Sequence, residues 1–337
     1  MYNISNATIR EATFMCRFYI DLGFVAAACN VLNIVVVISS RDLLRKYVYF
    51  VAFNFCELLN AFSYIMVGVG RAKELKEETL FTQTTVHDCF ATKYWPHVLI
   101  LGTELPAYCL LLISCERLLL VLRPLDYTRV FGKVSKCRRL LIVPFAGVVS
   151  ILAAFLSAYQ DGERIVETQH CFIIDSTAAW FATFHFVIIV APFLVSVVSF
   201  IIMWRTFAQR TRLRSSYRVR LSRKNAAGSM VKVGVRLVIS GLSALLFSLS
   251  SALMLSKLWR AKDFDDITVA VIYSMPGFLS VLNTIATFAV HRKVRRQLVT
   301  LVGFGIISIY NVCQNAVCTE TTTTGGIKHN EAIFHFM

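Results

Sequence analysis

Long apolar runs alternate along the chain with shorter polar and charged stretches. A membrane-spanning helix needs about 20 mostly apolar residues, and seven runs reach that length with few internal charges. The runs are continuously apolar rather than alternating, which favours helices over barrel strands. The predicted spans are residues 18–40, 48–70, 94–122, 140–159, 178–204, 233–256 and 267–290. The pattern therefore predicts an all-α membrane protein whose core is a seven-transmembrane helix bundle.

The overall composition agrees with a membrane protein. Of the 337 residues, 56% are hydrophobic and only 16% are charged, and the mean hydropathy is +0.62. A soluble domain has about 25% charged residues. The net charge of +15 would suit nucleic acid, but the basic residues alternate with predicted spans. We therefore expect no nucleic-acid partner and interpret the basic loops as contacts with anionic membrane lipid.

Lysine and arginine are distributed unevenly between the two sides of the predicted bundle. Short loops rich in these residues stay in the cytoplasm. The segments after the first, third, fifth and seventh spans carry more than twice as many of them as the N-terminal segment and the remaining loops. Two glycosylation acceptors, Asn3 and Asn6, point independently to an outer N-terminus. We expect the N-terminus outside and the C-terminus inside the cell, and no cleavable signal peptide, because residues 1–17 hold no apolar core.

The pattern divides the chain into three regions. Residues 1–17 are predicted to be an extracellular N-terminus, and residues 18–304 the seven-transmembrane domain. This domain ends in a basic amphipathic segment, 291–304, which is expected to form a short eighth helix. Residues 305–337 are a threonine-rich cytoplasmic tail whose composition is typical of disorder.

Cysteines occur in positions with different chemistry. Cys89 and Cys171 lie in loops on the outer side, where an oxidising environment allows a disulfide. We predict this bridge, and two free surface cysteines are the alternative. Cys313 and Cys318 follow the amphipathic segment and are candidates for palmitoylation. Two unmodified cysteines are the alternative. No cysteine or histidine spacing indicates a metal site.

Several polar side chains lie inside the predicted spans. Asn33, Glu57, Asn283 and Asn54 must face the interior of the bundle and find partners, because hydrocarbon offers none. They are expected to form an intramembrane network between the first, second and seventh spans. Such a network either takes part in switching or only holds the helices together.

Glu104 lies deep in the third predicted span. It precedes Arg117 on the same helix by about 20 Å at 1.5 Å per residue, which places it in the outer half of the bundle. A carboxylate at that depth needs a partner. It either contacts a cationic or hydrogen-bonding ligand, pairs with His185, or stays protonated as a structural side chain.

Glu116 and Arg117 form an acid–base pair at the end of the third span. Adjacent charges are costly in hydrocarbon, so the pair indicates a membrane boundary or a switch. Pro124 follows and is expected to end the helix. The stretch closes on Tyr127.

These residues resemble the signature of rhodopsin-like G-protein-coupled receptors. Glu116 and Arg117, followed by Pro124-Leu125-Asp126-Tyr127, are similar to that family's Asp/Glu-Arg-Tyr motif and its second-loop Pro-Leu-x-Tyr. The stretch from Asn283 to Leu298 resembles the Asn-Pro-x-x-Tyr motif that runs into an eighth helix. The resemblance covers about residues 18–300. It extends to an asparagine in span 1, an acid in span 2, a proline in span 5 and an outer disulfide, here Asn33, Glu57, Pro192 and Cys89 with Cys171.

The chain also departs from the family pattern. Leu118 replaces the tyrosine after the arginine, and Thr284 and Thr287 replace the proline and tyrosine of the span 7 motif. Span 4 has no tryptophan, and span 6 lacks the Cys-Trp-x-Pro kink, for which Gly241 offers flexibility instead. With its short loops and many phenylalanines, the chain looks like the divergent nematode serpentine chemoreceptors.

The resemblance implies a chemosensory receptor that binds an extracellular small molecule and activates a heterotrimeric G protein. It places the ligand between spans 3, 5, 6 and 7. The expected ligand-binding residues are Glu104, Tyr108, His185, Phe186, Met254 and Tyr273. The expected G-protein switch consists of Glu116, Arg117, Pro124 and Tyr127, with Arg117 paired to Glu116 at rest.

The resemblance also implies partners and a location. An arrestin and a receptor kinase would act on the threonines of the tail, since phosphate would make it anionic. The chain would lie in the plasma membrane, in sensory cilia if it is a chemoreceptor. No cofactor and no enzymatic activity are expected.

Three other functions stay open. A peptide-binding receptor would share the same fold. A transporter or channel would be indicated by broken helices in paired positions and an internal repeat; neither is evident, although Pro106, Pro192 and Pro276 interrupt spans. A membrane zinc hydrolase would need clustered histidines, whereas the seven histidines are dispersed.

Overall fold

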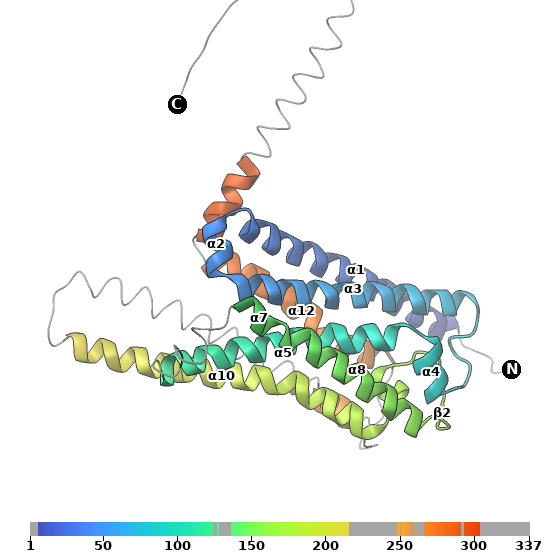
Figure 1. The fold of residues 1–337 in the computed structure, drawn as a ribbon. Coiled ribbons are helices and arrows are strands. Elements are labelled where there is room, and N and C mark those ends of the chain that lie inside the picture. Colours follow the sequence, from blue (N-terminus) through green and yellow to red (C-terminus); the bar gives the residue numbers. More distant parts are fainter. Residues whose placement is uncertain are drawn as a thin grey trace, which may run out of the picture.

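The described part of the chain is a bundle of long helices. The computed structural model describes residues 6–123, 127, 136–215, 248–249, 251–256, 259, 266–290 and 293–303. Within these ranges, six helices are long and apolar enough to cross a membrane. They lie side by side with roughly parallel axes (Figure 1). They are α1 (Asn6–Ile38), α3 (Val48–Lys76), α5 (Trp95–Leu122), α8 (Ile142–Gln160), α10 (Ala179–Ser215) and α12 (Asp266–Val290). The chain is therefore an all-α, multi-pass membrane protein.

Five of the predicted spans correspond closely to α3, α5, α8, α10 and α12. The expected span 233–256 lies outside the described residues, apart from 248–249 and 251–256, which are helical. Residues 293–303 are also helical, within the segment expected to form an eighth helix. They leave the bundle beside α2 (Arg41–Lys46) (Figure 1), where Gln297 Nε2 donates to Ser39 Oγ over 3.2 Å.

The first helix begins earlier than the apolar pattern predicts. α1 starts at Asn6, so most of the expected N-terminal segment continues the first span as helix. Ala12, Met15, Cys16 and Tyr19 are buried at helical spacing on one face of this extension. Packing of that face against the bundle explains why the helix extends into a segment whose average composition is polar.

The bundle has the inverted polarity of a membrane protein. Asn30, Asn54 and Asn60 are each 1% exposed. Large apolar side chains face outward instead, for example Phe145 and Leu152 on α8, which are 69% and 58% exposed. Outward apolar and inward polar surfaces suit a lipid surrounding, in which interior polar groups must pair with one another.

α1 and α3 approach each other closely through two glycines. A Cβ atom at Gly68 would lie 2.7 Å from the Cys16 carbonyl oxygen, and one at Gly23 would lie 2.8 Å from the Ala61 carbonyl oxygen. Small residues at such crossings let helix backbones pack tightly where lipid provides no hydrophobic drive. The two glycines fix how α1 lies along α3.

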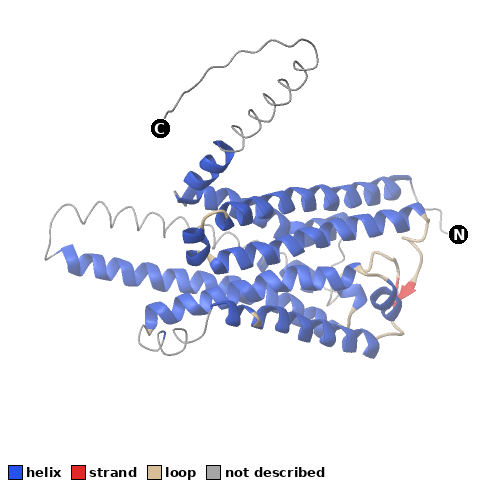
Figure 2. Cartoon of the chain, turned by 45° about the horizontal axis from the view of Figure 1, so that its top comes forward, coloured by secondary structure: helices blue, strands red, loops and turns tan. Residues whose placement is uncertain are grey.

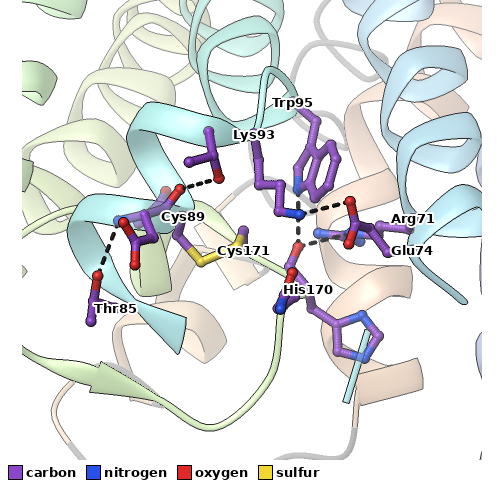
Figure 3. The surroundings of a disulfide bond; sticks show 12 residues. Arg71, Glu74, Thr85, Cys89, Lys93, Trp95, His170 and Cys171 are labelled. Carbon is purple, nitrogen blue, oxygen red and sulfur yellow. Dashed lines mark hydrogen bonds and ion pairs between the residues drawn. A yellow bond between two sulfur atoms is a disulfide. The ribbon is translucent and has the colours of Figure 1, made fainter. Parts of the chain in front are cut away.

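One end of the bundle is closed by short elements and a disulfide, and we call it the disulfide end. The strand β1 (Thr84–Thr85) pairs antiparallel with β2 (Ile165–Val166), and Figure 2 shows this small strand pair at the tip of the bundle. α4 (Val86–Thr92) and α9 (Ile173–Ser176) complete the end. Cys89 on α4 is bonded to Cys171, with 5.4 Å between their Cα atoms (Figure 3). The predicted bridge is confirmed.

The opposite end carries the Glu116–Arg117 stretch, and we call it the Arg117 end. α2 and the short helix α7 (Lys136–Leu140) lie here, and α10 extends beyond its neighbours (Figure 1). α5 runs from one end of the bundle to the other. It is therefore the element that connects the chemistry at the two ends.

Candidate functional site

A buried acid–base pair joins α5 to α10 in the disulfide half of the bundle. Glu104 Oε1 lies 2.6 Å from His185 Nδ1, and both residues are 0% exposed. Pro106 on α5 and Pro192 on α10 lie close by in sequence. Of the three roles expected for Glu104, the structure shows the pairing with His185.

Two hydroxyls complete the surroundings of this pair. Tyr108 donates to Glu104 Oε2 over 3.0 Å, so both carboxylate oxygens have a partner. Thr103 Oγ1 lies 3.5 Å from His185 Nε2. A group that binds in the neighbouring cavity therefore meets the His185 ring and Thr103 before it meets the carboxylate.

A small cavity lies directly beside His185. It is bounded by α5, α10, the helical residues 251–256 and α12. Four of the predicted ligand-binding residues line it: His185, Phe186, Met254 and Tyr273. The other two, Glu104 and Tyr108, stand behind His185. The lining also includes Thr103, Ile189, Ser251, Ile272 and Pro276, none of which the sequence predicted as a ligand contact.

The cavity is small in this conformation. Its volume is about 30 Å³, and the lining is mostly apolar. A space of this size accommodates one or two water molecules. A larger molecule would have to separate the surrounding helices, so occupancy and helix arrangement are coupled at this point.

A polar network joins α1, α3 and α12 near the middle of the bundle. The Asn33 side-chain amide donates to Asn54 Oδ1 and to Thr284 Oγ1, each over 2.8 Å. Asn30 donates to Ser280 Oγ over the same distance. The network thus connects the three expected helices, with partners that differ from those expected.

Glu57 and Asn283 were also expected in this network. Glu57 is buried, 8% exposed, and its carboxyl interacts with Ser280 and Asn60. Asn283 is only half-buried and, among the described residues, makes no hydrogen bond; the neighbouring Thr284 provides the contact to Asn33 instead. The helical register of α12 turns Thr284 rather than Asn283 toward α1.

At the Arg117 end, Glu116 is held by partners from other elements. Tyr127 donates to Glu116 Oε1 over 3.1 Å, and Arg139 Nη2 of α7 lies 3.7 Å from the same oxygen. Arg139 Nε also donates to Tyr49 Oη over 3.0 Å. Burial, and then the nearby Glu116 carboxylate, raise the pKa of the Tyr127 phenol. These four residues, Tyr49, Glu116, Tyr127 and Arg139, form what we call the Glu116 cluster.

The expected pairing of Arg117 with Glu116 is not formed. The Arg117 guanidinium instead lies over the Phe200 ring of α10, 5.3 Å from its centroid. Adjacent residues on a helix point about 100° apart and do not face one another, which explains the difference. Arg139 takes the place that was expected for Arg117. Pro124, also expected in the switch, lies outside the described residues.

The other sites predicted from the sequence either lie outside the described residues or take no part in the contacts above. Asn3, Cys313 and Cys318 lie outside the described residues, and Asn6 begins α1. Among the residues that the structure describes, no group of three histidine, cysteine, aspartate or glutamate side chains could hold a metal ion.

Comparisons with known proteins assign no family. No protein-family model matches the chain, and no curated protein matches it either.

Proposed function

We propose that this chain is a rhodopsin-like G-protein-coupled receptor, chemosensory in role, which binds an extracellular small molecule and activates a heterotrimeric G protein. One observation carries the proposal. α5 holds Glu104 beside the cavity of the disulfide half and Glu116 within the cluster at the Arg117 end. Twelve helical residues separate them, which is about 18 Å. A movement of this helix against its neighbours would change the contacts of both Glu104 and Glu116.

The ligand acts by widening the cavity beside His185. Because that cavity holds only one or two water molecules, a larger bound molecule favours an arrangement in which α10 and the residues around 251–254 move away from α5. A ligand shifts such an equilibrium only by its differential affinity for the two arrangements, typically about 1–3 kcal/mol.

The Glu116 cluster holds the resting state at the cytoplasmic end. Arg139 and Tyr127 bind the Glu116 carboxylate, and Arg117 rests over Phe200 of α10. Outward movement of the sixth span, 233–256, would draw α10 with it and release Arg117 to the G protein. The basic segment 205–232 would contact the G-protein α subunit.

The same proposal includes topology and location. The chain has a seventh span at 233–256 and an eighth helix at 291–304, with the N-terminus outside the plasma membrane, in sensory cilia for a chemoreceptor. Asn3 and Asn6 carry glycans, and Cys313 and Cys318 carry palmitate. An arrestin and a receptor kinase act on the threonine-rich tail.

A cell-based screen tests the proposal. Cells that express the chain are exposed to pooled volatile and water-soluble chemicals, with calcium or cAMP as the readout. We expect a pool that activates these cells and not mock-transfected ones. Ser251→Phe, which fills the small cavity, should remove the response while surface expression persists. Failure of every pool, together with solute uptake by proteoliposomes that contain the chain alone, would replace the receptor with a transporter.

A further inference from the structure

A fully buried arginine lies at the disulfide end of α3. Arg71 is 0% exposed, although it belongs to the most strongly hydrated class of side chains. A guanidinium stays charged in proteins, so the group cannot neutralise itself to escape the penalty of burial. Neighbouring groups must therefore offset the desolvation cost of the buried guanidinium.

The described contacts of Arg71 supply only part of that compensation. Arg71 Nε donates to the His170 carbonyl over 2.9 Å, and Trp95 Nε1 donates to the same oxygen over 3.2 Å (Figure 3). The guanidinium carbon lies 4.1 Å from the Phe172 ring centroid and 5.6 Å from that of Tyr19. The two rings form an aromatic cage around the cation, which offsets part of its desolvation.

Two donor groups of the guanidinium are left over. Nη1 and Nη2 are buried and make no hydrogen bond of standard geometry among the described residues, and the nearby Tyr19 hydroxyl offers them only a neutral neighbour. The nearest carboxylate on the same helix, Glu74, is engaged elsewhere. Its Oε1 lies 2.7 Å from Lys93 Nζ (Figure 3). Its Oε2 accepts a hydrogen bond from Thr79. Unpaired buried donors on a charged group are costly, so this cation lacks an anion.

A second unpaired donor lies close to the cage. The Tyr273 hydroxyl is buried and donates no hydrogen bond among the described residues. Its ring stacks on Phe172, with 5.4 Å between centroids and 11° between planes. Phe172 is therefore in contact with both Arg71 and Tyr273, and the unpaired groups of these two residues belong to one site.

The cage lies between two cavities along one face of α12. Ile267 lines a second small cavity with His170 and Met15, toward the disulfide end. Three residues on, the Ala270 carbonyl accepts from Tyr19 of the cage over 3.1 Å. Three residues further, Tyr273 lines the cavity beside His185. Positions three apart share a helix face, so the second cavity, the cage and the first cavity follow one another.

We propose that Arg71 and Tyr273 bind the carboxylate of a small organic acid whose apolar tail occupies the cavity beside His185. This deepens the receptor function and rests on it only in calling the bound acid a signal. A guanidinium matches a carboxylate with two parallel hydrogen bonds. The Tyr273 hydroxyl adds a third donor. The mostly apolar lining of the cavity, which includes Ile189, Met254 and Ile272, suits a hydrocarbon tail that enters as the surrounding helices separate.

Thermal unfolding of the purified full chain in phosphatidylcholine nanodiscs tests the site. The probes are straight-chain carboxylates from acetate to hexanoate, each compared with the primary alcohol of the same length. Tryptophan fluorescence is a suitable signal, because Trp95 donates to the same carbonyl as Arg71. We expect at least one acid to raise Tm in a saturable way and its alcohol not to do so.

Variants then locate the bound carboxylate. Arg71→Gln should weaken acid binding by about 30-fold or more, as expected for loss of one partner of a buried charge pair. Tyr273→Phe should weaken it by about 10-fold. Lys73→Gln removes an exposed positive charge two residues along α3 and should bind like wild type. Should Arg71→Gln fail to fold, Tyr273→Phe decides, because the Tyr273 hydroxyl donates no hydrogen bond in the described structure and its removal should leave the fold intact.

Three outcomes would overturn the proposal. In the first, no acid raises Tm more than its alcohol does; in the second, both variants bind acids like wild type. In the third, phosphatidylglycerol in the disc displaces the acid, which would assign the site to a lipid headgroup. The assay contains no G protein, so its failure is distinct from failure of the receptor function. A neutral activator that acts unchanged on Arg71→Gln would leave the receptor and remove the acid site. Acid binding without any G-protein activation would leave the acid site and remove the receptor function.

Discussion

Glu104 Oε1 and His185 Nδ1 lie 2.6 Å apart between α5 and α10, and neither residue is exposed. Within the described disulfide half, this acid–base contact joins the two helices, and His185 borders the cavity. Its loss therefore tests whether this contact holds α5 and α10 together beside the cavity.

A double-mutant cycle should show that this pair couples α5 to α10. Glu104→Gln and His185→Phe each remove the acid–base contact and should lower the free energy of unfolding. We expect a coupling free energy of about 1–2 kcal/mol, near the upper end for hydrogen bonds inside membrane proteins. Thermal unfolding in nanodiscs provides the measurement. Glu77→Gln, at an exposed ion pair with Lys73, serves as the control and should change little. Additive effects of the two substitutions would contradict the account.

Loss of Arg139 should raise activity in the absence of ligand. Arg139→Gln removes the ion pair with Glu116 and the hydrogen bond to Tyr49, both of which are largely buried. If the Glu116 cluster holds the resting arrangement, its loss should raise basal G-protein activation about tenfold, which corresponds to a shift of about 1.4 kcal/mol. The measurement is basal cAMP or calcium at matched surface expression. Arg138→Gln alters an exposed neighbour and should leave the basal level unchanged.

The disulfide should contribute strongly to stability. Cys89 and Cys171 are 82 residues apart in sequence, and closing a loop of that size constrains the unfolded chain by about 4–5 kcal/mol in the chain-entropy account. Replacing both by alanine should lower Tm markedly, and a reductant should lower the Tm of the wild type but not of this variant. Cys115→Ala changes an exposed free cysteine and should have little effect. An unchanged Tm in the double variant would contradict the expectation.

Much of the fold is evident from the sequence because lipid imposes simple rules. Apolar runs predict α5 and α8 within two residues of their observed bounds. The bridge between Cys89 and Cys171 follows from their place in loops on one side. The early start of α1 was missed because its buried face is carried by a few residues within a polar segment, and average hydropathy does not reveal such a face.

Only part of the candidate site could be predicted, because the sequence places residues within spans but does not show which side chains face one another. The apolar runs place Glu104 and His185 inside predicted spans, where a carboxylate needs a partner, and a pair between them was one of three alternatives. Periodicity does not show which neighbour faces a charge across helices. Arg139 reaches Glu116 only because α7 packs beside α3 and α5, and Arg71 gave no signal beyond one basic residue in an expected loop. Contacts that depend on rotation about a helix axis need the tertiary structure.

In the proposed receptor, Arg117 transmits the ligand signal to a G protein, and a single substitution at this residue is the decisive test. Arg117→Ala removes the guanidinium that lies over Phe200 of α10. The measurement is G-protein activation by an active chemical pool, with surface expression measured in the same cells. We expect the ligand-driven response to be lost while the variant still reaches the surface in normal amount. A normal response from a well-expressed Arg117→Ala variant would contradict it.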